Sequence, residues 1–96
     1  MESTTQMSTG RKSGEGLALY QFEGCPFCAR VVDTLEDLGV DVEIRDTLQD
    51  AERGRELVAA TGRRMVPVLR IEEADGDVRW MPESADIIAY LRKRFG

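Results

Sequence analysis

Two cysteines separated by two residues are the part of this sequence best suited to chemistry. They stand in the stretch Cys25-Pro26-Phe27-Cys28 and are the only cysteines among the 96 residues. This spacing is typical of a redox pair, of half a metal site, or of two thiols in a core. The chain contains no histidine, so imidazole is available neither as a metal ligand nor as a general base. A nucleophilic thiol must therefore be activated by other means.

The expected elements around the pair offer that activation. A short apolar run at 17–22 indicates a buried strand, and helical spacing of apolar residues begins at Pro26. Cys25 would then be the N-cap of a helix, where unpaired amides and the helix dipole favour a thiolate. Pro26 suits the first helical turn. Cys28, one turn further on, can reach the Cys25 sulfur, which predicts a nucleophile and a resolving thiol.

Other interpretations of Cys25 and Cys28 remain open at this point. Two buried thiols in a core would need no redox role, because free cysteine is among the most buried residue types. A structural zinc site needs about four nitrogen or sulfur ligands, and this chain offers two sulfurs, so we expect no metal within one chain. Two chains could share an iron-sulfur cluster if a partner or glutathione supplied further thiolates.

The remaining sequence predicts a small α/β domain of order βαβαββα. Alternation at 40–44 indicates a second strand, parallel to the first and near a sheet edge. The turn residues Asp75-Gly76 join two extended runs, 66–71 and 78–81, into an antiparallel hairpin. Three helices are expected at 26–38, 50–61 and 83–95. In the second helix Asp50 is a candidate cap, the apolar side is Ala51, Leu57 and Val58, and Gly54 is a weak point.

Length and charge limit the function further. A chain of 96 residues supports one domain, which we place at 17–96 after a disordered tail at 1–16. The net charge of −5 disfavours generic binding to nucleic acid. The start of the chain lacks a secretory pattern, and no apolar run approaches the roughly 20 residues of a membrane span. We therefore expect a cytoplasmic monomer without membrane contact.

Three segments resemble the glutaredoxin family. Residues 20–28, YQFEGCPFC, are similar to the family's Cys-Pro-Tyr-Cys junction of strand and helix, with Phe27 in place of the commoner tyrosine. Residues 65–69, MVPVL, resemble the cis-proline segment of thioredoxin-like folds. Residues 81–90, MPESADIIAY, resemble the Pro-Glu-Ser helix start in the N-terminal domain of glutathione transferases and in two-domain bacterial glutaredoxins. The similarity extends over 17–95 and is closest to this transferase-like branch.

The resemblance implies a thioredoxin-like fold of the glutaredoxin type, with a four-stranded mixed sheet flanked by three helices. It also implies reduction of protein disulfides and glutathione mixed disulfides, with glutathione as a reducing co-substrate and Cys25 as the nucleophile. Glutathionylated or disulfide-bonded proteins would be the partners. The alternatives are a non-catalytic iron-sulfur carrier, a redox-responsive binding module, or a thioredoxin-like reductant served by a flavoprotein reductase.

The resemblance further implies a set of glutathione-binding residues. Val66 would pair its backbone with the cysteinyl part of glutathione, and Glu83 and Ser84 would hold the γ-glutamyl end. Phe27 and Pro67 complete the set. An acceptor beside a hydroxyl and helix amides suits an ammonium and a carboxylate. In the simpler interpretations, Glu83 and Ser84 only cap a helix and Pro67 is a trans proline on an edge strand.

The sequence also departs from the family pattern. Phe22 stands where family members often carry a lysine, so part of the expected positive charge near the thiol is missing. Arg30, Arg63 and Arg64 are candidates to replace it and to attract anionic glutathione; otherwise they are solvated surface residues. The Gly-Gly pair before the last helix of small glutaredoxins is replaced at 81–82, which agrees with the transferase-like branch.

Overall fold

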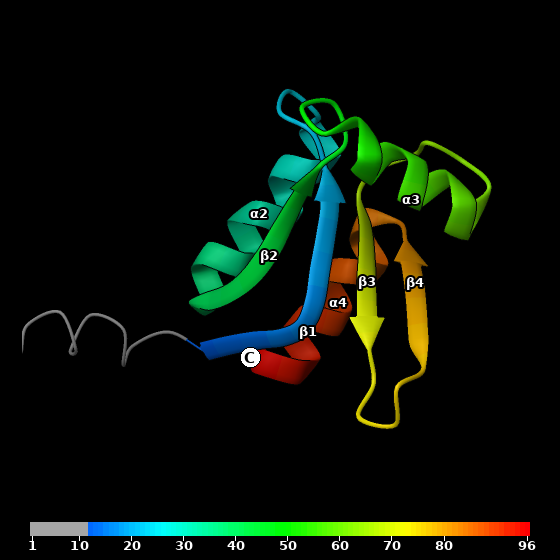
Figure 1. The fold of residues 1–96 in the computed structure, drawn as a ribbon. Coiled ribbons are helices and arrows are strands. Elements are labelled where there is room, and N and C mark those ends of the chain that lie inside the picture. The colour runs from blue at the N-terminus through cyan, green and yellow to red at the C-terminus, as the bar shows by residue number, and fades with distance from the viewer. Residues whose placement is uncertain (1–11) are drawn as a thin grey trace, which may run out of the picture.

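A four-stranded sheet and three helices make up the described part of the chain. The structure, a computed structural model, describes residues 12–96 (Figure 1). The elements are β1 Lys12–Gln21, α2 Pro26–Leu38, β2 Val40–Asp46, α3 Ala51–Thr61, β3 Val68–Glu72, β4 Val78–Pro82 and α4 Ser84–Phe95. This is the predicted βαβαββα order, and the fold is thioredoxin-like.

The sheet is mixed and has the strand order β2-β1-β3-β4. β1 pairs with β2 in parallel and with β3 antiparallel, so Leu19 lies between Ile44 and Leu69. β3 pairs antiparallel with β4 through the hairpin predicted at Asp75-Gly76. The predicted place of β2 at a sheet edge is confirmed.

β1 begins earlier than the sequence pattern indicated. Its first residues, Lys12 and Ser13, pair with Val40 and Asp41 of β2, before an irregularity in the pairing that ends at Ala18. Residues 12–16 therefore belong to a strand, and their prediction as disordered tail was wrong. Ladder pairing uses backbone groups and needs no apolar side chains, so composition alone did not reveal it. The rest of the predicted tail, 1–11, lies outside the described residues.

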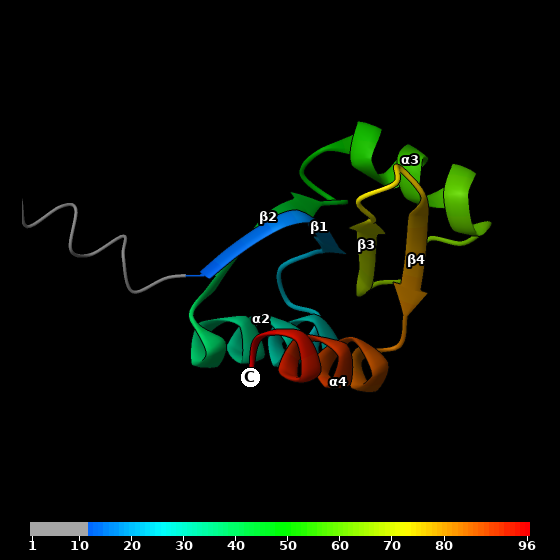
Figure 2. The same ribbon diagram turned by 90° about the horizontal axis from the view of Figure 1, so that it is seen from below.

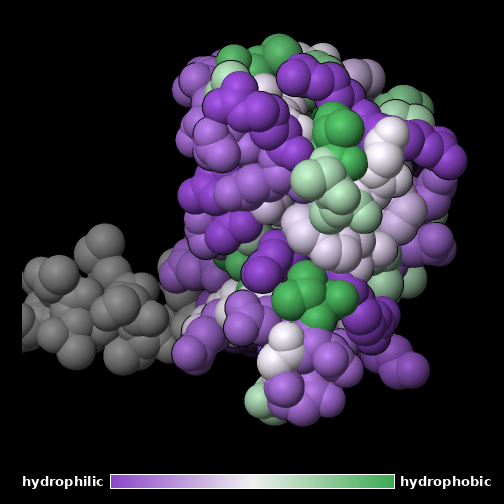
Figure 3. Space-filling model, turned by 45° about the vertical axis from the view of Figure 1, so that its right-hand side comes forward, coloured by the Kyte–Doolittle hydropathy of each residue, from purple (hydrophilic) through white to green (hydrophobic). Residues whose placement is uncertain are grey.

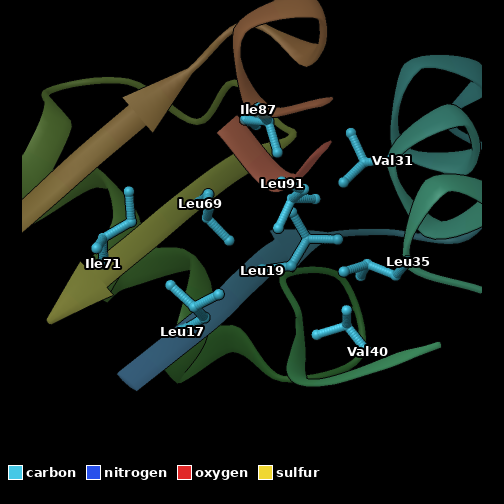
Figure 4. Close-up of a cluster of buried hydrophobic side chains, with 9 residues drawn as sticks. All are labelled: Leu17, Leu19, Val31, Leu35, Val40, Leu69, Ile71, Ile87 and Leu91. Carbon is cyan, nitrogen blue, oxygen red and sulfur yellow. The ribbon is translucent and has the colours of Figure 1, made fainter. Parts of the chain in front are cut away.

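The main core lies between the sheet and the helices α2 and α4, which cover the same face (Figure 2). In Figure 4 its side chains, contributed by both helices and by strands β1 to β3, point toward one another. Helical spacing of four residues places Val31 and Leu35 of α2, and Ile87 and Leu91 of α4, on the buried sides. The full cluster is Leu17, Leu19, Val31, Leu35, Val40, Leu69, Ile71, Ile87 and Leu91.

The opposite face of the sheet carries α3 and a much smaller core (Figure 2). Three fully or nearly fully buried side chains form it, namely Tyr20, Leu57 and Val68. Val66 and Trp80 pack against this cluster and are partly exposed. The α3 face of the domain is therefore held by few apolar contacts.

The predicted apolar side of α3 was only partly correct. Leu57 is fully buried, but Val58 is 37% exposed and Ala51 is exposed as well. Gly54, predicted as a weak point, is buried against the Thr47 carbonyl, 3.4 Å from the position a Cβ would take. The reason is that α3 packs at Gly54 against the backbone just after β2, where a small residue allows close approach. Asp50 caps the helix as predicted, because its side chain accepts from the Glu52 amide.

The surface is mostly hydrophilic and carries separate hydrophobic patches, as the face in Figure 3 shows. Within residues 12–96 no helix has the length and apolar character that crossing a bilayer would require. The large apolar side chains exposed to solvent are Phe27, Ile44, Leu48, Val58, Met65 and Val78.

Candidate functional site

The junction between β1 and α2 places Cys25 at a helix start, as predicted. Gly24, with a φ of 95°, turns the chain after β1 in a conformation that favours glycine. Cys25 is the N-cap of α2, with extended φ and ψ, and Pro26 follows as the first helical residue. The Cys28 amide donates to the Cys25 sulfur over 3.3 Å. A helix-terminal amide thus points at the sulfur that would carry negative charge.

The two thiols differ in exposure. Both are free, Cys25 is 9% exposed, and Cys28 is fully buried. Burial, with a further contribution from the hydrogen bond to Cys25, raises the pKa of the Cys28 thiol to about 12. Cys28 is therefore protonated at neutral pH, and Cys25 is the thiol with access to the outside. No three Cys, Asp or Glu side chains gather as a metal ion would require within 12–96.

A groove of about 570 Å³ begins beside the cysteines at Phe27. All five residues that the resemblance assigns to glutathione line it, namely Phe27, Val66, Pro67, Glu83 and Ser84. They come from the start of α2, the segment before β3 and the start of α4. The peptide bond between Val66 and Pro67 is cis. The fold thus gathers the predicted binding residues into one hollow.

Val66 lies outside the sheet pairing, and Glu83 has a backbone conformation that is rare for its residue type. Val66 precedes β3, whose pairing with β1 and β4 begins at Val68, so the Val66 backbone lies outside the ladder. Glu83 is the N-cap of α4, with a φ of 74°, and its side chain makes no capping hydrogen bond. A glutamate in this region of φ is strained by about 1–3 kcal/mol. A purely capping role for the Glu83 side chain is therefore not what the structure shows.

Comparison with known proteins shows to which family the chain belongs. The model of the glutathione S-transferase N-terminal domain matches residues 19–96. The chain belongs to this family. Glutaredoxin 2 of Escherichia coli strain K12 is 34% identical over 82 residues, which are 83% of this chain and 34% of that protein. The chain thus spans about a third of the length of the curated relatives it matches.

Solved structures support the same family. The trimeric glutathione transferase TDR1 of Leishmania is 30% identical, with a TM-score of 0.69, and the match covers 83% of this chain and 18% of that one. Maleylacetoacetate isomerase of Anaeromyxobacter dehalogenans, with glutathione bound in its active site, is also 30% identical. Its TM-score is 0.62, and the match covers 82% of this chain and 37% of that one.

The three candidate arginines of this glutathione S-transferase N-terminal domain are not equivalent. Arg63 lines the groove, whereas Arg30 and Arg64 do not. The Arg63 guanidinium donates from Nη1 to the Met65 sulfur over 3.4 Å. Phe22, in the position where lysine is common, is half-buried and directly follows β1. Positive charge in the groove lining therefore comes from Arg63.

Several groove residues were not anticipated from the sequence. They are contributed by the last turn of α3, the loop after it and strands β3 and β4, and they are Ala60, Thr61, Met65, Val68, Trp80 and Pro82. Trp80 pairs with Arg70 in the β3–β4 ladder and has the Arg70 guanidinium 5.8 Å above its ring. The hairpin register, once known, puts Trp80 on the α3 side; the sequence alone did not show how far α3 extends over it.

A polar network ties α3 to the sheet next to the groove. The Tyr20 hydroxyl donates to Glu56 of α3 over 2.8 Å, and Arg45 of β2 donates to the same hydroxyl over 2.7 Å. The hydrogen bond from Tyr20, together with the nearby Arg53, lowers the pKa of Glu56. Burial raises the pKa of Tyr20, so the phenol stays neutral and keeps its proton to donate. This network supplements the small apolar cluster beneath α3.

Proposed function

We propose that this protein is a glutathione-dependent thiol-disulfide oxidoreductase of the glutaredoxin type. The observation that carries the proposal is the N-cap position of Cys25 beside a groove lined by Phe27, Val66, Pro67, Glu83 and Ser84. The groove offers a site for an extended peptide, and the N-cap thiol offers the nucleophile. The similarity to Glutaredoxin 2 of Escherichia coli supports the same class of reaction.

The first step forms a mixed disulfide with glutathione. The Cys25 thiolate attacks the glutathione sulfur of a substrate R–S–S–G, a new S–S bond forms, and R–S⁻ leaves and takes up a proton. A second glutathione thiolate then attacks the glutathione sulfur held on Cys25, which releases oxidised glutathione and regenerates the Cys25 thiolate. The net change converts R–S–S–G and one glutathione into R–SH and oxidised glutathione.

Cys28 has a different role in this proposal. Its burial and its pKa of about 12 make it a poor attacking group in the resting protein. When the substrate is a protein disulfide, Cys25 becomes joined to the substrate, and Cys28 attacks Cys25 after losing its proton. This step forms the Cys25–Cys28 disulfide and releases a protein dithiol, and two glutathione molecules then reduce the pair. Glutathione mixed disulfides require Cys25 alone.

The groove can recognise glutathione through three kinds of contact. Glu83 offers a carboxylate to the γ-glutamyl ammonium, since the Glu83 side chain makes no capping bond. The Ser84 hydroxyl and the first amides of α4 suit the neighbouring carboxylate. The Val66 backbone, outside the sheet ladder, is suited to pair with the cysteinyl residue. These roles leave the glycine end of glutathione to other residues.

The biological setting is part of the proposal. Glutathione as electron donor requires a reducing compartment, for which the cytoplasm is the natural choice. Disulfide-bonded or glutathionylated proteins would be the partners, and the monomeric state of the domain remains a prediction. An iron-sulfur carrier is the competing role, because a dimer bridged by Cys25 and glutathione would use the same groove.

Turnover of a mixed glutathione disulfide tests the proposal. The assay couples wild type, Cys25→Ser and Cys28→Ser to glutathione reductase and NADPH. We expect Cys25→Ser to lose activity to background and Cys28→Ser to retain most of it with the glutathione mixed disulfide. Substantial activity in Cys25→Ser would refute the mechanism. An absorbance spectrum after anaerobic purification serves as the control, because a coloured, cluster-bearing dimer would support the carrier role instead.

A further inference from the structure

Met65 is the exposed methionine of the described part of the chain. The sequence contains four methionines, of which Met65 and Met81 lie within residues 12–96. Met65 is 57% exposed. Met81, in contrast, is partly buried and packs against the main core cluster. Oxidants dissolved in water therefore reach the sulfur of Met65 more easily than that of Met81.

The Met65 side chain also lies where a change in its polarity would alter the groove. Met65 precedes Val66, and both residues line the groove. The Arg63 guanidinium donates from Nη1 to the Met65 sulfur over 3.4 Å. A thioether is a weak acceptor, so this contact leaves most of the donor strength of the guanidinium unused. A strong donor is thus already in place beside the sulfur.

Oxidation of the thioether would give this donor a stronger acceptor. We propose that Met65 is a site of reversible oxidation, at which a peroxide converts the thioether to a sulfoxide and weakens the binding of glutathione in the groove. The O–O bond of hydrogen peroxide breaks, and one oxygen atom forms a bond to sulfur. The thioether gives up two electrons, and the peroxide is reduced to water. The Arg63 guanidinium can then donate to the new oxygen, which stabilises the product.

The sulfoxide changes the lining of the groove. A polar, hydrated group replaces an apolar side chain beside Val66, so a ligand loses the apolar contact that the thioether offers. Loss of apolar contact equivalent to one methylene group raises the KM for glutathione about fourfold. The chemistry of Cys25 is unchanged, because neither cysteine is modified. This consequence rests on the proposed function, whereas the oxidation itself does not.

Glutathione does not reverse this modification. It returns a disulfide at Cys25 to the thiol by thiol-disulfide exchange, but a methionine sulfoxide is reduced by methionine sulfoxide reductase. Oxidation of Met65 therefore outlasts the catalytic cycle and persists until that reductase acts.

Peptide mapping by mass spectrometry tests the site itself. The Cys25–Cys28 disulfide is formed first, which protects both thiols, and the protein is then exposed to hydrogen peroxide under native conditions. We expect sulfoxide to form about fivefold faster at Met65 than at Met81, and the difference to disappear in urea, because exposure sets the rate. Equal rates at the two methionines in the folded protein would overturn the assignment.

Turnover with glutathione before and after peroxide treatment tests the consequence. Dithiothreitol first restores the cysteines and leaves the sulfoxide in place. The proteins are wild type, Met65→Leu and, as matched control, Met81→Leu, whose side chain does not line the groove. We expect peroxide to raise the KM for glutathione about fourfold in wild type and in Met81→Leu, with kcat unchanged, and to leave the KM of Met65→Leu as it was. Methionine sulfoxide reductase should restore the wild-type KM.

The outcomes separate this inference from the proposed function. Sulfoxide at Met65 without a change in KM, or the same rise in KM in Met65→Leu, would overturn the effect on glutathione while leaving the Cys25 mechanism intact. If wild type shows no turnover, the proposed function fails, and equilibrium titration with glutathione measures the effect instead. An affinity lowered about fourfold by the sulfoxide would still support the inference, and an unchanged affinity or no binding would refute it.

Discussion

The two faces of the sheet bury different numbers of apolar side chains. Helices α2 and α4 pack on one face over a cluster of nine buried side chains, while α3 packs on the other over a cluster of three. The smaller cluster is supplemented by the hydrogen bonds among Tyr20, Glu56 and Arg45. Apolar burial stabilises a domain in proportion to the area removed from water, so the α3 face has the smaller share of the folding free energy.

The groove draws on both faces. Phe27, Glu83 and Ser84 of its lining belong to the starts of α2 and α4, on the well-packed face, whereas Arg63 follows α3. The proposed chemistry and the γ-glutamyl contacts are thus fixed to the rigid part of the molecule. Thr61 and Arg63 of the groove lining are fixed to the part that opens at lower cost in free energy. Substitutions that destabilise α3 should therefore weaken glutathione binding before they slow the reaction of Cys25.

The largest expected effect comes from truncating one leucine on each face. Leu19→Ala in the nine-residue cluster should lower the free energy of unfolding by about 4 kcal/mol, and Leu57→Ala beneath α3 by about 2 kcal/mol, because the open α3 face relaxes more easily. Urea denaturation measures both values. Amide hydrogen exchange should show that Leu57→Ala accelerates exchange mainly in α3. Uniform acceleration over the whole sheet in Leu57→Ala would show that the two faces are not independent.

Two substitutions of Glu83 should show that its backbone, on the well-packed face, is strained. Glu83→Ala and Glu83→Gly both remove the carboxylate, so both should raise the KM for glutathione to the same extent. Glycine adopts a φ near 74° without steric conflict, and Glu83→Gly should therefore be more stable than Glu83→Ala by about 1 kcal/mol. Thermal denaturation of the two variants gives the difference. Equal stabilities would mean that the position carries no strain.

A substitution in α3 should strengthen the weaker face. Gly54→Ala improves helix propensity, and the added Cβ would lie 3.4 Å from the Thr47 carbonyl, an ordinary contact. The free energy of unfolding should rise by about 0.5–1 kcal/mol, with slower amide exchange in α3. Gly62→Ala is the contrasting control, because Gly62 has a φ of 81° and the substitution there should destabilise. A destabilising Gly54→Ala would contradict the close but unstrained packing of this helix.

The smallest expected effect is a pH dependence of α3. Glu56 has a folded-state pKa below its ordinary value, so its stabilising contribution is present above pH about 4.3 and is lost as the pH falls through the lowered value. Acid should therefore loosen α3 before the rest of the domain. Glu56→Gln should be less stable than wild type at pH 7 and should lose less stability between pH about 5 and about 3. An identical acid response in both proteins would show that Glu56 does not cause the acid sensitivity of α3.

The better-packed face was also the more predictable from sequence. A cap, a proline and regular apolar spacing define α2 locally, so the start of the helix at Pro26 and the N-cap place of Cys25 followed from the sequence alone. The start of β1 at Lys12 did not, because pairing with β2 depends on backbone groups. Ala51 and Val58 were misplaced, since the contact of α3 with the sheet is set by tertiary packing around Gly54 and Leu57.

The groove residues also fall into two groups, those that short motifs identify and those that depend on the tertiary fold. Phe27, Pro67 and Glu83 lie in short motifs and were identified as candidates, and the fold brings them to one hollow. Trp80 and Thr61 lie outside those motifs. Their place in the lining depends on the β3–β4 register and on how far α3 reaches across the sheet, which local patterns do not encode.

The central claim, that Cys25 is the thiol that receives glutathione, has a direct test. Cys28→Ser and Cys25→Ser are each incubated with oxidised glutathione under native conditions, and intact-protein mass spectrometry then measures the adduct. Cys28→Ser should gain one glutathionyl group on Cys25 within minutes. Cys25→Ser should remain unmodified until it is unfolded, because Cys28 is fully buried and its pKa is raised to about 12. Rapid modification of Cys28 in folded Cys25→Ser, with none of Cys25 in Cys28→Ser, would contradict the account.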